Sequence, residues 1–170
     1  MPETQTQPRT ASEVAQAAFE RFSAHDVEGC LALWHPEGIQ DWVALRVIRG
    51  HDEIRALFNE LFAAVPDLEM TVEQVTSDER RCVIQWRSRG THTGGPLNGI
   101  EPTGRTAELR GVDIMEVEDG VIVRNTVYYD GAAYARAFGM MPPQDSTAER
   151  TMISAFNAVT KVRKAISERT

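Results

Sequence analysis

RTAELRGVDIMEVEDGVIVRNTVYYD, residues 105–130, alternates apolar and polar side chains on both sides of the pair Asp119-Gly120. A period of two is typical of a β-strand with one buried face, and Asp-Gly between two such runs is a strong signal for a tight hairpin turn. The stretch therefore predicts two antiparallel strands. Two more alternating runs come before it, one from residue 68 and one around residues 82–86, so we expect a mostly antiparallel sheet in this half of the chain.

Helical periodicity dominates the first part of the chain. Thr10 and Glu13 stand at the spacing of a capping box, and apolar residues then recur on one helical face, which predicts a helix over residues 11–24. Asp26 is a suitable N-cap for a second, shorter helix. A third helix follows residue 50 and ends at Pro66, where the apolar residues stop recurring at helical spacing.

These elements predict an α+β fold, because three helices precede nearly all of the sheet. We expect the helices to pack on one face of a strongly curved sheet. Residues 39–48, IQDWVALRVI, predict an early strand or strand pair that closes one edge of it.

The chain divides into a polar tail (residues 1–10), one α+β domain (11–142) and a helical extension (143–170). A short helix is expected around residues 131–138 and a longer one over 146–167. One side of the last helix is apolar and carries Met152, Phe156, Val159 and Ile166. Two explanations of this stripe stay open: packing on its own domain, or contact with a second copy in a homodimer.

Composition limits the possible functions. The formal net charge of −7 argues against a nucleic-acid partner, which normally requires a basic surface. No apolar run approaches the ~20 residues of a membrane span, and the polar N-terminus has no apolar signal-peptide core, so we expect a cytoplasmic protein without a membrane partner. Cys30 and Cys82 have no metal-ligand spacing and are interpreted as reduced core thiols, a disulfide being the minor alternative.

A glycine-rich connection, GTHTGGPLNGIEPTGR at residues 90–105, links two of the predicted strands. It is either a plain turn segment or the rim of a pocket that His92 faces. Its glycines do not follow the dinucleotide-binding spacing, and no phosphate loop, Ser-His-Asp order or metal cluster can be assembled from the sequence. We therefore expect neither a cofactor nor a metal.

This connection and residues 111–142 together resemble the SnoaL-like polyketide cyclases of the nuclear-transport-factor-2-like superfamily. The resemblance rests on Gly-Thr-His-x-Gly followed by Pro-Thr-Gly-Arg, and on a strand, an Asp-Gly turn, a strand that ends in Asp and a short helix. It implies a cone of three helices against a curved sheet that encloses an apolar pocket. Relatives include cofactor-independent cyclases, isomerases, epoxide hydrolases and members without known activity, so the resemblance implies the pocket and leaves the substrate open.

The sequence departs from the family pattern at two places. Where the family often has His-Trp-Asp-x-x-Asp on the last strand, Thr126 and Val127 replace the Trp and the first Asp, and Asp130 remains. Arg110 and Asp113 are separated by two residues, which puts them on opposite strand faces and disfavours epoxide hydrolysis.

Three residues are candidates for catalysis. Asp130 ends the last strand, where an apolar pocket mouth would raise the pKa of its carboxyl and make it a general base; its alternative role is to cap the helix that follows. Asp113 lies among apolar residues and shares a face with Leu109 and Met115, so it is a second candidate acid facing the cavity, or a solvated residue if that face points outward. His92 can polarise a carbonyl or move a proton near neutral pH, or simply bond the backbone of its own turn.

Aromatic residues are the candidate walls of the pocket, because they provide contact area with few rotors. Trp42 and Trp86 are two of them. Tyr128 and Thr126 share the face of Asp130 by period-two counting, and alternation allows only one of Tyr128 and Tyr129 to face inward.

The leading hypothesis is a cofactor-independent enzyme that performs acid/base chemistry next to a carbonyl of an apolar small molecule, as a cyclase or isomerase does. Asp130 would remove the proton, and His92 or Tyr128 would stabilise the enolate. The alternative is a non-catalytic ligand-binding or dimerisation protein with the same fold.

Overall fold

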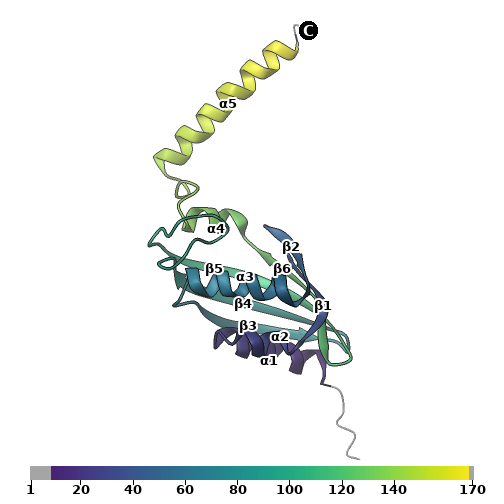
Figure 1. Ribbon diagram of the computed structural model, residues 1–170. Coiled ribbons are helices and arrows are strands. Elements are labelled where there is room, and N and C mark those ends of the chain that lie inside the picture. The colour runs from purple at the N-terminus through teal and green to yellow at the C-terminus, as the bar shows by residue number, and fades with distance from the viewer. Residues whose placement is uncertain (1–8, 169–170) are drawn as a thin grey trace, which may run out of the picture.

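A computed structural model describes residues 9–168, apart from the side chain of Ala165 (Figure 1). It contains one six-stranded mixed sheet in the order β2-β1-β6-β5-β4-β3. The elements, in chain order, are α1 (Ala11–Ser23), α2 (Val27–Leu31), β1 (Trp34–Trp42), β2 (Arg46–Arg49), α3 (Gly50–Ala64), β3 (Glu69–Ser77), β4 (Arg81–Thr91), β5 (Thr106–Glu118), β6 (Val121–Tyr129), α4 (Gly131–Ala137) and α5 (Thr147–Ser167). The expected α+β architecture is confirmed.

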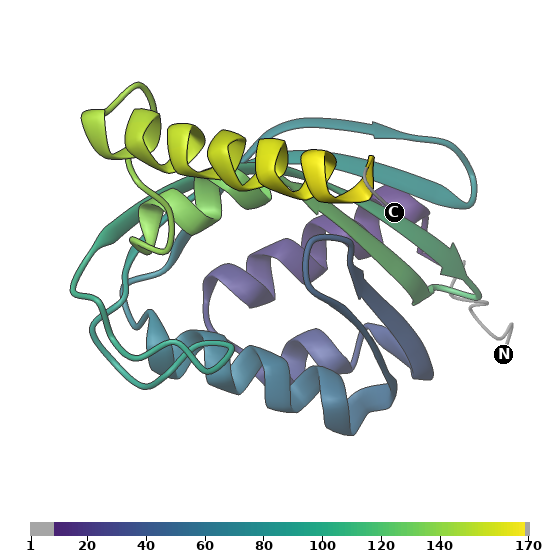
Figure 2. The same cartoon turned by 90° about the horizontal axis from the view of Figure 1, so that it is seen from above.

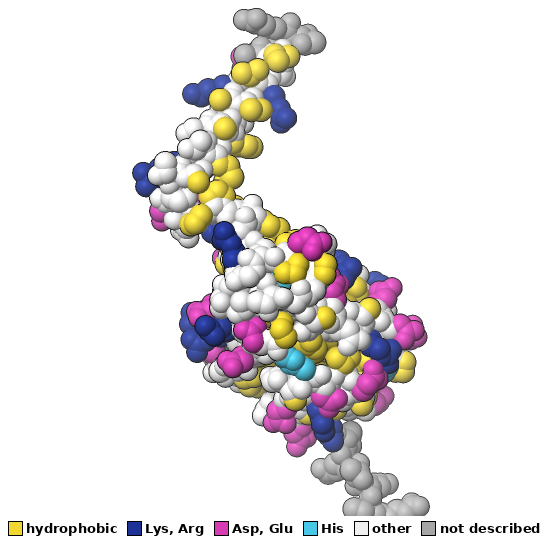
Figure 3. All heavy atoms as spheres, turned by 60° about the vertical axis from the view of Figure 1, so that its left-hand side comes forward, with side chains coloured by type: hydrophobic (Ala, Val, Ile, Leu, Met, Phe, Trp, Pro, Cys, Tyr) yellow, Lys and Arg dark blue, Asp and Glu magenta, His cyan; other side chains and the backbone are white. Residues whose placement is uncertain are grey.

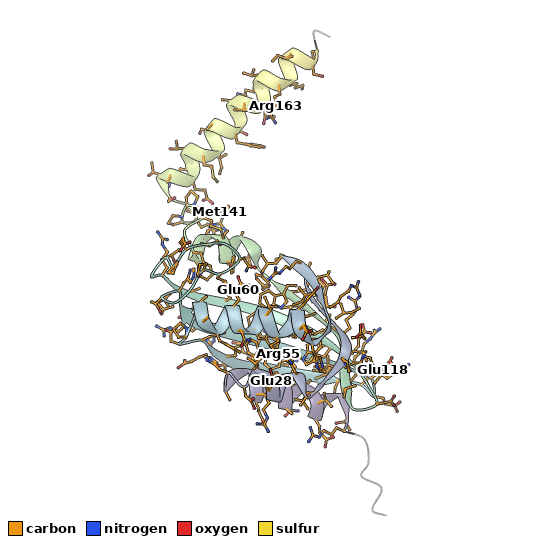
Figure 4. All side chains as sticks on the ribbon, viewed as in Figure 1. Glu28, Arg55, Glu60, Glu118, Met141 and Arg163 are labelled. Carbon is orange, nitrogen blue, oxygen red and sulfur yellow. The ribbon has the colours of Figure 1, made fainter. Side chains whose placement is uncertain are left out.

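The first three helices lie together on one face of the curved sheet, as the view from above shows (Figure 2). The capping box at the start of α1 is present: the Thr10 hydroxyl accepts from the Glu13 backbone N–H, and the Glu13 carboxylate accepts from the Thr10 N–H. Asp26 caps α2 by accepting from the Gly29 N–H. Arg55 of α3 reaches Glu28 of α2 at 2.6 Å, and the two labelled side chains point toward each other (Figure 4).

The Asp-Gly hairpin forms between β5 and β6 as predicted. Asp119 and Gly120 have φ of 48° and 79°, the left-handed backbone that a two-residue hairpin turn needs and that Asp and Gly tolerate best. The pairing is not uniform, however, because the register shifts between Glu116 and Val117. An extra residue on one strand turns all side chains beyond it to the other face of the sheet.

The first strand is longer than the sequence indicated. β1 begins at Trp34, pairs with β2 in antiparallel fashion, and runs parallel to β6. The predicted strand pair at the sheet edge is therefore confirmed, and the parallel pairing places Gln40 directly opposite Asn125. Both side chains are buried.

The core lies between the helices and the concave face of the sheet. Its largest fully buried side chains are Leu31, Ile54, Leu57, Ile84 and Ile122. Cys30 and Cys82 are buried free thiols within it, and burial raises the pKa of Cys30 to about 12. Within residues 9–168, no helix combines the length and the apolar character needed to cross a membrane.

The last helix projects away from this core (Figure 1). Its first turn is tied to α4 by the Arg136–Glu149 ion pair at 2.9 Å. No described residue of α5 is buried, so its apolar stripe does not pack on its own domain.

Candidate active site

A cavity of about 140 Å³ lies between the helices and the concave face of the sheet. Its walls are mostly apolar and come from all three N-terminal helices, from β1 and β3–β6, from the 92–105 connection and from α4. Apolar cavities of about 150 Å³ hold a benzene-sized ligand. The cavity therefore has room for a small cyclic or folded apolar molecule.

Among the residues that the structure describes, Asp113 is the one acidic residue in the cavity wall. It lies in the middle of β5 and is 7% exposed. From the neighbouring strand β4, the Trp86 Nε1–H donates to its Oδ1 at 2.6 Å, and from β6 the Asn125 amide donates to its Oδ2 at 2.6 Å. The carboxyl group is thus fixed from both sides.

The environment of Asp113 shifts its proton affinity. Removal from water disfavours the charged carboxylate and raises the pKa to about 6, although the hydrogen bonds from Asn125 and Trp86 act in the opposite direction. A carboxyl group with this pKa is largely ionised at neutral pH and still basic enough to accept a proton, as a general base must be. Each oxygen also keeps a lone pair for a further donor.

Gly111 allows this arrangement, because the Trp86 ring lies against it. Trp86 is the cross-strand partner of Gly111, and a Cβ there would overlap the indole ring and approach the Tyr128 carbonyl oxygen to 2.7 Å. The absence of a side chain at this position therefore lets the indole reach Asp113, two residues further along the strand.

We expect Gly111→Ala to displace the Trp86 ring and to destabilise the fold by about 1–3 kcal/mol, the usual cost of overpacking. Urea denaturation followed by tryptophan fluorescence measures both effects. Gly95→Ala is the control, because a Cβ at that position would meet no atom of another segment within 4 Å. Equal stability of the two variants would contradict the close packing.

The cavity wall contains buried hydrogen-bonding atoms without a partner. Among them are the Gln40 Oε1, the Asn125 Oδ1 and the Tyr129 hydroxyl. Gln40 and Asn125 are each 3% exposed. A buried polar atom without a hydrogen bond is costly, so these atoms are suited to bind polar groups of a ligand.

The structure brings three of the predicted residues together. Asp113, Trp86 and Trp42 all line the cavity, and Trp42 contacts the ring of Tyr129 edge-on at 6.4 Å between centroids. The expectation that Asp113 faces the cavity with Leu109 and Met115 is confirmed.

The expected inward face of β6 is wrong. Thr126 and Tyr128 do not line the cavity, Tyr128 is 50% exposed, and Asn125, Val127 and Tyr129 face inward instead. Without the register shift, Thr126 would pair with Asp113; with it, Val127 does. The prediction counted from Asp130, and that residue caps α4 instead of facing the cavity.

Asp130 lies outside the cavity. Its side chain is exposed and accepts from the backbone N–H groups of Ala132 and Ala133 at 2.8 and 2.9 Å, so it caps α4. The carboxylate therefore bonds the backbone of α4, away from any ligand in the cavity. This placement gives no support to the predicted general-base role.

His92 also lies outside the cavity wall. It is fully buried, its Nε2 is 3.0 Å from the Gly95 carbonyl oxygen, and its ring contacts Phe138 edge-on. Of its two proposed roles, the geometry favours the bond to its own turn.

Sequence reasoning missed Gln40 and Asn125, and of the two alternatives Tyr128 and Tyr129 it chose the one that does not line the cavity. A polar residue at Gln40 or Asn125 within an otherwise apolar strand face was the available signal, but it required the correct inward face of each strand. No three His, Cys, Asp or Glu side chains among the described residues are grouped so as to hold a metal ion.

Solved structures share this fold. A proposed SnoaL-like polyketide cyclase from Jannaschia sp. CCS1 superposes with a TM-score of 0.70 and 22% identity over 78% of this chain and 93% of its own. AclR, a proposed hydroxylase from Streptomyces galilaeus, superposes with a TM-score of 0.68 and 19% identity, over 78% of this chain and 97% of its own. TsrD from Streptomyces laurentii superposes with a TM-score of 0.67 and 22% identity, over 76% of this chain and 95% of its own.

The sequence itself matches a family model. No curated protein matches it, but the model of the SnoaL-like polyketide cyclases matches residues 12–138. This match covers the first four helices, the whole sheet and the cavity wall up to Phe138, and the chain therefore belongs to the SnoaL-like polyketide cyclase family.

Proposed function

We propose that this protein is an acid/base enzyme in which Asp113 moves a proton next to a carbonyl group of an apolar substrate. The observation that carries the proposal is a buried carboxyl group with a pKa of about 6 in the wall of an apolar cavity. The mostly apolar wall removes the carboxyl group from bulk water, which strengthens the electrostatic interactions around it.

The chemistry follows from the position of this group. Ionised Asp113 takes a proton from the carbon next to the carbonyl, and the electron pair of that C–H bond moves to give an enolate. Burial raises the pKa of Tyr129 to about 12, so its hydroxyl keeps its proton and can donate to the enolate oxygen. In a cyclisation, the enolate carbon attacks a second carbonyl, and protonated Asp113 returns its proton to the new alkoxide.

The polar atoms near Asp113 suggest the kind of substrate. The Gln40 Oε1 and the Asn125 Oδ1 are acceptors without a donor, and the remaining wall is mainly apolar. A compact ring or folded chain that carries a hydroxyl or enol group would satisfy them. A ligand without such a donor would leave both oxygens unpaired, at a cost in affinity.

We expect 4-ethylphenol to bind more tightly than its methyl ether, 4-ethylanisole, and Gln40→Leu to reduce this preference about tenfold, which is the effect of one hydrogen bond. NMR titration measures the four affinities. Gln85→Leu, on the outer face of β4, is the matched control and should keep the preference. An unchanged preference in Gln40→Leu would remove Gln40 from the binding site.

Turnover itself is tested with heptane-2,6-dione, a small diketone that closes to a six-membered ring by intramolecular aldol addition. Wild-type protein should accelerate ring closure, as product analysis would show, and Asp113→Asn should not. If the wild-type protein binds such diketones and returns them unchanged, the acid/base proposal fails.

A ligand-binding protein without chemistry is the second candidate. It is favoured by one observation: both Asp113 oxygens already accept a hydrogen bond within the protein. Binding of the phenol without turnover of any carbonyl compound would support this alternative.

A further inference from the structure

Helix α5 lies outside the family's common fold and carries an exposed apolar stripe. The family model ends at residue 138, before the helix begins. In the structure we define this stripe by five apolar side chains, which are between 42% and 69% exposed: Met152, Ile153, Phe156, Val159 and Val162. Figure 3 shows hydrophobic side chains along the projecting helix.

The exposed area of the stripe matches the area that one partner contributes to a specific protein–protein interface. Its five side chains expose roughly 500 Å², at the upper end of what a monomeric protein shows, and two such stripes in contact bury roughly 1,000 Å², the area a specific dimer needs. A second copy of the chain supplies this matching surface.

The spacing of the stripe indicates a helix as the occupant. Met152, Phe156, Val159 and Arg163 follow one another at intervals of four, three and four residues, which is the seam of two helices packed side by side. A helix pair of this kind is self-complementary about a two-fold axis.

We propose that α5 pairs in antiparallel orientation with α5 of a second copy, with Phe156 at the centre of the contact. This proposal does not depend on the proposed function.

The charges on α5 favour the antiparallel orientation. Arg163 lies in the seam itself, with Lys161 and Lys164 beside it in the sequence; its position on the outer part of the helix is labelled in Figure 4. A parallel pair would place the two Arg163 side chains against each other. In an antiparallel pair centred on Phe156, the two Arg163 side chains lie at opposite ends of the contact. Each is then at the level of Glu149 of the second copy, which also pairs with Arg136 of its own chain.

The antiparallel pair also keeps the two cavity domains apart. A helix of 21 residues is about 30 Å long, and the domain is attached at its N-terminal end. The two domains thus lie at opposite ends of the pair, and each cavity stays accessible.

The mass of the full chain in solution tests the pairing. Sedimentation velocity at about 100 μM should give twice the mass of the Phe156→Asp variant, because the new carboxylate cannot be buried in the seam. Ser154→Asp adds the same charge on the opposite side of the same helix and should keep the wild-type mass. Circular dichroism of both variants checks that the helix and the domain stay folded.

Cysteine cross-linking tests the orientation. In the antiparallel pair, position 156 meets itself and position 159 does not, so Phe156→Cys should oxidise to a linked dimer and Val159→Cys should not. In a parallel pair both positions would cross-link equally. Cys30 and Cys82 are buried and do not compete.

Three results would overturn the proposal. One is an equal mass of the wild-type chain and Phe156→Asp, which would place any association elsewhere. Another is equal cross-linking at positions 156 and 159. The third is a monomeric chain that binds phosphatidylglycerol vesicles through α5, which would make a lipid surface the occupant.

Discussion

Asp113→Asn is expected to abolish turnover and, at pH 7.5, to make the protein more stable. The amide cannot accept the proton, and loss of a general base lowers the rate by about 10²–10⁴. The gain in stability arises because the native state holds this carboxylate away from water. The new amide oxygen can still accept from Trp86, and the new N–H₂ group can donate to the Asn125 oxygen once that amide rotates.

The size of the stability gain depends on pH with a definite sign. The folded-state pKa of Asp113 is raised from 3.8 to about 6, so between these values the native protein binds more protons than the unfolded chain. The wild type therefore loses stability as the pH rises through about 6, by on the order of 3 kcal/mol for a shift of this size. Well below pH 3.8 the carboxyl group is protonated in both states and this penalty is absent.

Urea denaturation of both proteins at pH 4.5 and pH 7.5 measures this difference. The excess stability of Asp113→Asn should be small at pH 4.5 and large at pH 7.5. Asp119→Asn makes the same chemical change in the exposed hairpin turn and should alter neither turnover nor the pH dependence. Full turnover in Asp113→Asn would end the proposed mechanism, and a pH-independent stability difference would contradict the buried, raised pKa.

Trp86→Phe is expected to move the acid limb of the pH–rate profile to higher pH. The variant keeps most of the aromatic wall but removes the Nε1–H that donates to Asp113 and helps to lower its pKa. A hydrogen bond to a charged group contributes about 1.5–3 kcal/mol, which corresponds to a shift of about one to two pH units. Activity at pH 6 should therefore fall much more than activity at pH 8.5.

Comparing the activities at pH 6 and pH 8.5 separates a shift of the Asp113 pKa from a general loss of structure. Trp42→Phe changes another tryptophan of the cavity wall, and Asp113 accepts its hydrogen bonds from Trp86 and Asn125. Its acid limb should stay near the wild-type position. If Trp86→Phe lowers the rate by the same factor at every pH, Trp86 acts in packing only and does not position or tune the carboxyl group.

Much of the fold could be predicted from local sequence, because its signals act over a few residues. The capping box of Thr10 and Glu13 and the Asp119-Gly120 turn each depend on backbone geometry within four residues, and both lie where the sequence predicts them. Asp113 is a candidate on the sequence for a similar reason: a carboxyl group in an apolar strand is costly unless it is paired or functional.

The rest of the site depends on longer-range pairing. Period-two counting along β6 is correct only relative to a starting residue, and the prediction started from Asp130, which caps α4 and does not face the cavity. This is why the sequence predicts Thr126, Tyr128 and Asp130 at the cavity, whereas Asn125, Val127 and Tyr129 line it. Gln40 joins the site through the parallel pairing of β1 with β6, a contact between residues far apart in the chain.

Local signals in the chain are sufficient for the family resemblance, the order of the elements and the candidacy of an acid within an apolar strand, because hydrophobic periodicity, caps and turn residues act between near neighbours. The groups that surround that acid, and the projection of the last helix away from its own domain, follow from packing between distant segments. Strand register and helix docking depend on which apolar surfaces of distant segments are buried against each other. Neighbouring residues in the sequence do not specify that pairing.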